Sequence, residues 1–188
     1  MENNEELKSK QRALELWDKD IISTYEVGTF KGLSQIHAFL FQDVFEFAGK
    51  LRTVNLAKGN FRFAPVLFLK SNLDLIDRMP DSTFDEIVDK YVEMNVAHPF
   101  REGNGRATRL WLDALLKNRL ALCVDWSKID KYDYLSAMER SPVNSLEIKT
   151  LLKHAITDDI HDRQVYMRGI QASYRYENMH AYNIEDLK

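Results

Sequence analysis

The stretch His98-Pro-Phe-Arg-Glu-Gly-Asn-Gly-Arg-Ala-Thr-Arg109 separates two predicted helices of this chain. A residue before proline is disfavoured in the α region, so a helix that arrives from the N-terminal side must stop near His98. Gly103 and Gly105 allow positive φ, and a new helix starts within these glycines. Its apolar residues at helical spacing are Leu110, Leu112, Leu115 and Leu116. We therefore predict a helix–loop–helix around this stretch.

Apolar residues recur at helical spacing before and after this stretch. Thr29 can cap one helix, and Pro65 and Pro80 bracket another. Thr83 and Glu86 form a capping box for the helix that leads to His98. The apolar positions of these helices are Leu33, Ile36 and Leu40, then Leu69, Leu73 and Ile76, then Phe84, Ile87, Tyr91 and Met94. Later helices are predicted over 131–139, 145–156 and 162–180.

Residues 52–64 depart from the helical pattern. Two β-leaning arms flank Lys58-Gly59-Asn60, and Gly-Asn is a good turn pair for a hairpin. A lone hairpin is marginally stable, and its open edge invites another chain. One interpretation is a structured connector, and the other is a flap that pairs with an extended segment of a protein substrate. The predicted fold is all-α, a helical bundle with one short β-hairpin.

Length, charge and histidine spacing restrict the class of protein. A chain of 188 residues can build one domain with a real core, and a net charge of −3 gives no general attraction to nucleic acid or membrane. No apolar run reaches the length of a membrane span, and a lone cysteine, Cys123, fits a buried thiol in a reducing cytoplasm. Four histidines share no metal-binding spacing and are expected to be surface or core groups: His37, His154, His161 and His180.

The glycines of the opening stretch, together with its arginines, favour binding of a polyphosphate. Backbone amides around Gly103 and Gly105, at a helix start, can form a nest for anionic oxygens. Arg106 and Arg109 lie three residues apart on the new helix, so both can face that nest. Guanidinium groups match phosphate oxygens bidentately.

A base and a metal ligand complete the set. His98 has an ordinary pKa suited to accepting a hydroxyl proton near neutral pH, and Glu102 offers Mg²⁺ one hard oxygen. Together these groups predict in-line displacement at phosphorus, with a protein hydroxyl as the nucleophile. The residues alone leave open which phosphorus is attacked. Phe100 is expected to anchor the loop in the core.

The stretch resembles the signature of the Fic family, H-x-F-x-[DE]-G-N-G-R-x-x-R, at all eight defined positions. The resemblance covers roughly residues 25–180 and implies a Fic-type helical bundle with the hairpin as a flap over the active site. It implies transfer of AMP from ATP–Mg²⁺ to a Tyr, Thr or Ser of a target protein, with release of pyrophosphate. A kinase branch has lysine at the position of Gly105, so glycine favours AMP transfer. The family also includes phosphocholine transfer, so another phosphate-linked group is an alternative.

The resemblance assigns roles to individual residues. His98 would be the base and Glu102 the Mg²⁺ ligand. The amides near Asn104 would hold the α-phosphate. The full set of implied nucleotide contacts is Gly103, Asn104, Gly105, Arg106 and Arg109, with Asn95 and Lys58 as further candidates.

Ser173-Tyr-Arg-Tyr-Glu177-Asn178 is the second informative segment. Ser173 and Glu177 lie at i and i+4, so one helix face carries a hydroxyl and a carboxylate. Alone, such a pair is typical of a solvated helix. In the Fic family, however, [ST]-x-x-x-E-[GN] on a C-terminal helix is inhibitory and marks the stand-alone bacterial class. A carboxylate on Arg109 would occupy the arginine that the terminal phosphate needs and misalign the nucleotide.

The predicted organisation is a helical extension over 1–24, a catalytic core over 25–160 with the flap at 52–64 and the signature at 98–109, and an inhibitory helix and tail over 161–188. Two function classes remain, an auto-inhibited protein adenylyltransferase and a catalytically silent nucleotide-binding or assembly module. The intact base favours the enzyme. We expect a cytoplasmic protein with a protein substrate docked by the flap, and no direct nucleic-acid or membrane partner. A type II topoisomerase subunit is one candidate target. A homo-oligomer and self-modification at Tyr174, Tyr176 or Tyr182 are further hypotheses.

Overall fold

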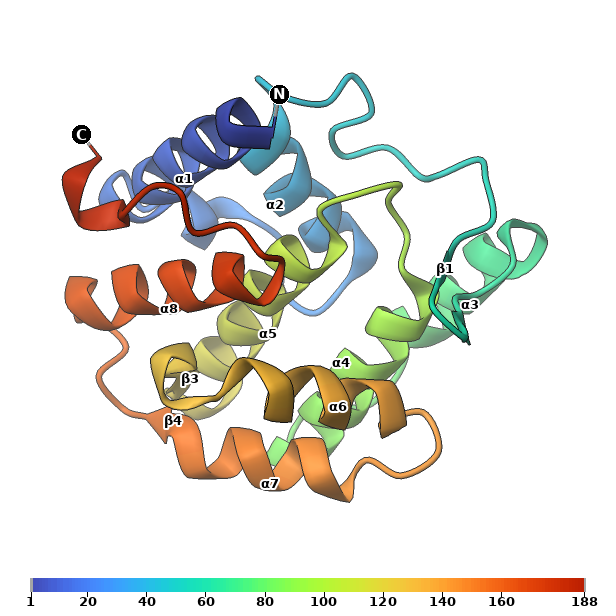
Figure 1. Ribbon diagram of the computed structural model, residues 1–188. Helices are drawn as coiled ribbons and strands as arrows, with labels where there is room; N and C mark the ends of the chain where they lie inside the picture. The colour runs from blue at the N-terminus through green and yellow to red at the C-terminus, as the bar shows by residue number, and fades with distance from the viewer. Residues whose placement is uncertain (1, 188) are drawn as a thin grey trace.

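The helix that carries the signature, α5 (Asn104–Leu120), runs through the middle of the molecule in the computed structural model, which describes residues 2–187 (Figure 1). Seven further α-helices surround it within that range. They are α1 (Glu2–Asp18), α2 (Phe30–Phe41), α3 (Val66–Asp77), α4 (Phe84–Ala97), α6 (Lys131–Arg140), α7 (Leu146–Ala155) and α8 (Arg163–Tyr176). None of the helices in this range is both long and apolar enough to cross a membrane.

Two clusters of buried side chains form the core, and α5 contributes to both. The first lies among α1, α2, α3, the end of α4 and α8, and it receives Trp111 from α5. The second lies among α4, α6 and α7, and it receives Leu112 and Leu115. A helix that is buried on two sides must be apolar on two sides, which explains the dense leucine pattern after the signature. The first turns of α5 thereby become fixed in position.

The caps predicted from the sequence fix the helix starts. The Thr29 hydroxyl accepts from the amide of Gly32, and Thr83 and Glu86 form both bonds of the capping box. Pro65 stands immediately before α3. These predictions are confirmed, because a cap depends on residues only three positions apart.

The helix predicted over 162–180 ends earlier than expected, at Tyr176. Asn178 has φ 61, and the amide of Met179 donates to the carbonyl oxygen of Tyr174 over 2.9 Å. This left-handed turn is a common helix stop, and asparagine adopts it more readily than most residues. The predicted helix therefore continues too far by four residues.

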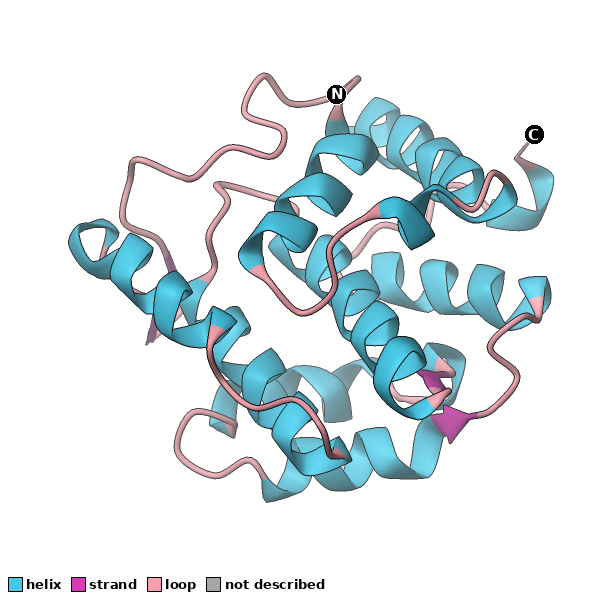
Figure 2. Ribbon diagram, turned by 180° about the vertical axis from the view of Figure 1, so that it is seen from behind, coloured by secondary structure: helices cyan, strands magenta, loops and turns pink. Residues whose placement is uncertain are grey.

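The predicted hairpin exists, but its strands are short. It consists of β1 (Ala57–Lys58) and β2 (Phe61–Arg62), which pair in antiparallel register around Gly59 and Asn60. A second antiparallel pair, β3 (Cys123–Val124) with β4 (Ile156–Thr157), joins distant parts of the sequence and is not a hairpin, and no sequence pattern predicted it. The all-α prediction is confirmed, since the strands form only two small ribbons among the described residues (Figure 2). Three short 3-10 helices complete the described range: Ile21–Thr24, Trp126–Lys128 and Ile184–Asp186.

Candidate active site

A cleft of about 710 Å³ lies between the flap, the signature loop, α6 and the end of α8. It brings together most of the residues predicted from the sequence. Those that line it are Lys58, Asn95, His98, Glu102, Gly103, Asn104, Gly105, Arg106, Arg109 and Glu177. Ser173 and Asn178 are the two predicted residues that do not line the cleft. Ser173 bonds Arg109, and Asn178 ends α8 next to Glu177.

His98 is the C-cap of α4 and has left-handed backbone angles, φ 47 and ψ 64. Its Nδ1 lies 3.3 Å from the carbonyl oxygen of Asn95, and a carbonyl can only accept, so Nδ1 carries the proton. The Nε2 lone pair is then free to accept a proton from another group. The ring stacks on Phe63 with centroids 3.7 Å apart, and burial lowers the pKa of His98 to about 4. The imidazole is therefore neutral at pH 7.

The signature loop is held in shape by its own side chains. Asn104 closes the loop with two bonds, because its Oδ1 accepts from the Phe100 amide over 2.8 Å and its Nδ2 donates to the Phe100 carbonyl over 2.6 Å. The side chain is therefore occupied, and the backbone amides remain to face a ligand. Phe100 is fully buried, which confirms its predicted role as an anchor. Gly103 has φ 80, and a Cβ there would lie 2.5 Å from the ring of Phe41.

His37, which was expected to be a surface or core residue, supports this loop from below. Its Nε2 donates to the carbonyl of Glu102 over 2.8 Å, and its Nδ1 accepts from the amide of Gly49 over 2.9 Å. Its ring stacks on Phe100 at 3.8 Å, and burial lowers the pKa of His37 to about 4. The signal in the sequence was its position between Ile36 and Leu40 on the buried face of α2.

Arg109 is buried and bonded entirely to its neighbours. Its Nε donates to the hydroxyl of Ser173 over 2.7 Å, and its Nη2 donates to the carbonyl of Ser173 and to Oε1 of Glu177, each over 2.9 Å. Its Nη1 donates to the hydroxyl of Tyr134 over 3.3 Å. Burial raises the pKa of the Glu177 carboxyl, but the charge of Arg109 outweighs it, and the pKa stays below its ordinary value. The predicted contact between Glu177 and Arg109 is present.

The Glu177 carboxylate also lies over the glycine nest. A Cβ built on Gly105 would lie 2.4 Å from Oε1 of Glu177. A carboxylate oxygen therefore lies beside Gly105, next to the predicted nest. Asn178 takes no part in the cleft, but its left-handed turn ends α8 so that Glu177 can face Arg109.

Arg106 has an acidic partner that no local sequence pattern predicts. Its Nη2 lies 2.7 Å from Oε1 of Glu5, on α1. Its guanidinium also lies over the rings of Phe41 and Tyr174, at 4.7 and 5.4 Å from their centroids. Both signature arginines are thus paired with carboxylates, one from each end of the chain.

The donor set fits Mg²⁺ only in company with phosphate oxygens. Glu102 is exposed at the edge of the cleft. No cluster of three or more His, Cys, Asp or Glu side chains that could hold a metal occurs within residues 2–187. One carboxylate, with waters and the oxygens of a bound nucleotide, is a common set for Mg²⁺.

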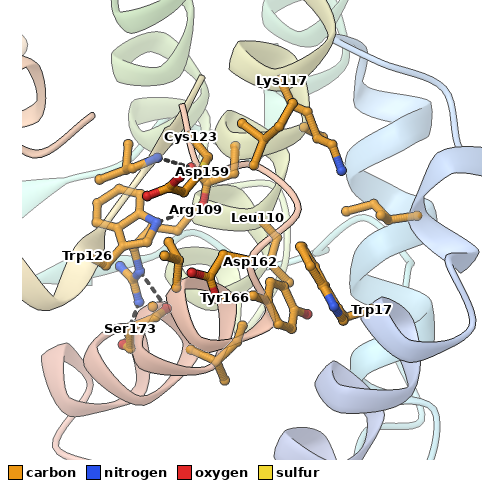
Figure 3. A pocket seen from close by; sticks show the side chains of 18 residues that line it. Trp17, Arg109, Leu110, Lys117, Cys123, Trp126, Asp159, Asp162, Tyr166 and Ser173 are labelled. Carbon is orange, nitrogen blue, oxygen red and sulfur yellow. Dashed lines mark hydrogen bonds between the residues drawn. The ribbon is translucent and has the colours of Figure 1, made fainter. Parts of the chain in front are cut away.

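A second, smaller cavity of about 70 Å³ lies behind the signature helix, between α5 and α8 (Figure 3). Arg109 and Ser173 reach its edge, but most of its walls are apolar. Asp113 is half-buried at this cavity and accepts from the amide of Val124 and from Nε1 of Trp126, each over 2.8 Å, while its partial burial raises its pKa to about 7. The cavity is too small and too apolar for a nucleotide, so the larger cleft is the candidate site.

The tyrosines proposed for self-modification differ in access. Tyr174 and Tyr176 are 1% and 2% exposed. The hydroxyl of Tyr176 donates to the carbonyls of Trp126 and Ile129. In this conformation neither hydroxyl can reach a nucleotide, whereas Tyr182 is half-buried. Cys123 is also only half-buried, and burial raises its pKa to about 12, so it is an unreactive thiol.

Comparison with known proteins gives a consistent result. Residues 29–116 match the profile of the Fic/DOC family. The protein adenylyltransferase VbhT of Bartonella schoenbuchensis is 29% identical over 166 residues, which are 82% of this chain and 34% of VbhT. A probable protein adenylyltransferase of Salmonella typhimurium is 25% identical over 138 residues, 67% of this chain and 68% of that protein. This chain therefore spans about a third of the first relative and about two thirds of the second.

A solved structure supports the fold. The BepC protein of Bartonella tribocorum, crystallised with bound AMPPNP, superposes with a TM-score of 0.64 at 22% identity, over 82% of this chain and 87% of BepC. At this level of identity, the likeness concerns the arrangement of the helices.

Proposed function

This chain carries a Fic domain, and we propose that it is an auto-inhibited protein adenylyltransferase that transfers AMP from ATP to a Tyr, Thr or Ser hydroxyl of a target protein. One observation supports the proposal above the rest. The cleft joins a neutral histidine with a free Nε2, a glycine nest at a helix start and two arginines, and a carboxylate lies beside Gly105. A silent nucleotide-binding module would need the nest and the arginines, but it would have no use for the base.

The proposed reaction is an in-line displacement at the α-phosphorus of ATP. Nε2 of His98 accepts the proton of the target hydroxyl, and the oxygen forms a bond to the α-phosphorus. The bond between that phosphorus and the bridging oxygen to the β-phosphate breaks, and pyrophosphate leaves. Amides around Gly105 hold the α-phosphate, and Arg106 and Arg109 stabilise the charge on the leaving group. Glu102 would hold Mg²⁺, which neutralises phosphate charge when bound.

The proposed brake is the carboxylate of Glu177. It uses the Nη2 of Arg109 that a terminal phosphate requires, and it covers the nest at Gly105. ATP could enter the open part of the cleft, but its phosphates would be displaced. A displacement of about 1 Å can slow a reaction about 100-fold. Ser173 strengthens the brake, because it holds Arg109 at Nε and Nη2.

We propose that the flap docks the target. Its residues 56–61 and Phe63 line the cleft beside His98. An extended segment paired with the flap edge by main-chain hydrogen bonds would present its hydroxyl to Nε2 of His98. The target is then a protein with an exposed extended segment, and a bacterial type II topoisomerase subunit in the cytoplasm is one candidate.

The test replaces the base in a background without the brake. We expect His98→Ala with Glu177→Gly to lose AMP transfer by at least about 100-fold relative to Glu177→Gly alone, because general base catalysis contributes about 10²–10⁴-fold. Transfer is measured with labelled ATP, and ATP affinity by calorimetry. ATP affinity should stay within a factor of about two, since the base contacts the incoming hydroxyl and not the nucleotide. Undiminished transfer would exclude His98 as the base.

A further inference from the structure

Arg52 lies between α2 and the flap, and its guanidinium is buried among main-chain carbonyls. The residue is 4% exposed. Nε donates to the carbonyl of His98 over 2.6 Å, and Nη1 donates to that of Val54 over 2.9 Å. Nη2 donates to the carbonyls of Ala64 and Ala97 over 2.5 and 3.0 Å. One side chain therefore joins three separate segments of the chain.

Two of these carbonyls belong to the end of α4. Ala97 is the last residue of this helix and His98 is its C-cap. Carbonyls at a helix C-terminus lack partners within the helix and carry partial negative charge, so a cation stabilises them. His98 also has a positive φ, which residues with a side chain rarely adopt. The bond from Nε of Arg52 holds the peptide that follows this unusual turn.

The other two carbonyls belong to the two legs of the flap. Val54 precedes β1 and Ala64 follows β2. The amide of Ala64 donates to the carbonyl of Val96 over 2.9 Å, and Phe63 stacks on the ring of His98. The flap and the imidazole are therefore fixed relative to each other, and Arg52 is the side chain that contacts both flap legs and the backbone of His98.

We propose that Arg52 is a positioning residue that sets the distance between the docked target hydroxyl and Nε2 of His98. The inference rests on the proposed function, in which the flap docks the target and His98 is the base. Arg52 does not line the cleft, so it has no direct contact with a nucleotide bound there. Its loss should therefore slow transfer to the protein target without weakening ATP binding.

Two variants separate the geometry of Arg52 from its charge. Arg52→Lys keeps the positive charge, but a single ammonium group cannot bond four carbonyls in three segments. Arg52→Gln removes the charge as well. Both are made in the Glu177→Gly background, with Arg140→Lys as the matched control, because Arg140 is exposed, pairs with Glu147 and does not itself line the cleft.

For Arg52→Lys we expect kcat for the protein target to fall about 100-fold, as for a displacement of about 1 Å, with ATP affinity within about twofold of the parent. The pH profile gives a second readout. The charges that act on His98 are those of Glu177, Arg52 and Lys58. In the Glu177→Gly background, Arg52→Gln removes a positive charge, so the acid limb of kcat/KM should move to higher pH, whereas Arg52→Lys should leave it in place.

An NMR measurement needs no catalysis and separates this inference from the proposed function. In Arg52→Lys the His98 ring should lose part of the ring-current shift caused by Phe63, while Arg140→Lys should preserve it. Unchanged ring-current shift and kcat would overturn the role of Arg52, and so would an equal loss of ATP affinity and kcat. If the Glu177→Gly parent shows no transfer that depends on His98, the proposed function fails, and the ring-current shift still decides whether Arg52 positions His98.

Glu5 supports a second, independent inference. It lies on α1, outside the region that matches the Fic/DOC family, and its side chain is 14% exposed. Its carboxylate bonds Nη2 of Arg106, and both residues line the cleft. The Nε of Arg106 is buried and has no partner among the described residues. The arginine is therefore held by Glu5, the sulfur of Met179 and two aromatic rings, while its buried Nε has no partner among the described residues.

We infer that Glu5 competes with nucleotide phosphates for Arg106 and is a second brake, separate from Glu177. The inference rests on the proposed function, because it assigns Arg106 to the leaving phosphates. A carboxylate and a phosphate oxygen require the same guanidinium donors. Nucleotide entry would then displace Glu5 at one end of the chain and Glu177 at the other.

The test is Glu5→Gln, with Glu15→Gln as its control, since Glu15 is on the same helix but pairs with Lys19 away from the cleft. Calorimetry with ATP should give about tenfold tighter binding for Glu5→Gln and no change for the control. Combined with Glu177→Gly, the gains in affinity should multiply, as for independent sites. Weaker binding would mean that Glu5 orients Arg106 for the phosphates, and equal binding would mean that it does not compete. The affinity measurement decides this even if no AMP transfer is found.

Discussion

Removal of the Glu177 carboxylate should have opposite effects on stability and on activity. In the structure, Oε1 of Glu177 lies 2.9 Å from Nη2 of Arg109, and the two side chains are 27% and 3% exposed. Glu177→Gly leaves the arginine with Ser173 and Tyr134 but without an opposite charge. An ion pair that served only the fold would give a less stable protein that is no more active. A brake should give a less stable protein that is more active.

Both magnitudes follow from this geometry. Breaking a fully buried ion pair costs about 3–5 kcal/mol of unfolding free energy. Because Glu177 is partly exposed, we expect Glu177→Gly to lose about 2–3 kcal/mol, at or below the lower end of that range. A charge-assisted hydrogen bond contributes about 1.5–3 kcal/mol, and each 1.4 kcal/mol is a factor of ten. Release of Arg109 to the nucleotide should therefore raise AMP transfer roughly 10- to 150-fold.

The assay combines chemical denaturation with transfer of labelled AMP. Glu177→Gln keeps the shape and a neutral hydrogen bond, so it should activate less than Glu177→Gly. ATP should stabilise the glycine variant more than the parent, because the nucleotide replaces the lost partner of Arg109. Glu147→Gly, which breaks an exposed pair with Arg140, is the control for loss of a glutamate. If Glu177→Gly transferred AMP at the parent's rate, the Glu177 carboxylate would not be a brake.

Three further predictions concern residues around the same cleft. Ser173→Ala removes one neutral bond of 2.7 Å to Nε of Arg109, worth about 0.5–1.5 kcal/mol, so its AMP transfer should rise by less than that of Glu177→Gly. The amide of Phe63 donates to the carbonyl of Leu56, and Ala57, which faces Arg62, is the next residue along β1, so its own amide points away from β2. Ala57→Pro removes this outward donor and should impair modification of a protein target, while ATP affinity stays that of the parent. Ala57→Ser keeps the amide and should modify the target as the parent does. His37 has a pKa lowered to about 4 in the folded protein, so its contribution to stability is full above pH 6.5 and is lost as the pH falls through 4. About 3 kcal/mol of unfolding free energy should disappear between pH 7 and pH 4 because of His37, so His37→Gln should lose about 3 kcal/mol less than the parent over this range in chemical denaturation. An equal loss in the two proteins would contradict the lowered pKa of His37.

Much of the fold could be predicted because helix ends depend on nearby residues. Thr29, Thr83 and Pro65 act within a few positions of themselves, and each begins a helix where expected. The end of α8 was misplaced because a left-handed asparagine at 178 can stop a helix without glycine or proline. The pairing of β3 with β4 joins segments that are distant in the sequence, and no local pattern marks such a pair.

The sequence by itself determined the chemical groups of the site. Base, carboxylate, nest and arginines lie within twelve residues, and a loop between two helices brings them together whatever surrounds it. The tertiary structure decided what each group touches. Arg106 pairs with Glu5, Arg109 pairs with Glu177, and Arg52 bonds the backbone of His98. The first two contacts join α5 to residues near opposite ends of the chain, and the packing of α1 and α8 against α5 brings them within bonding distance. The third joins the segment after α2 to the end of α4, and it too depends on tertiary packing.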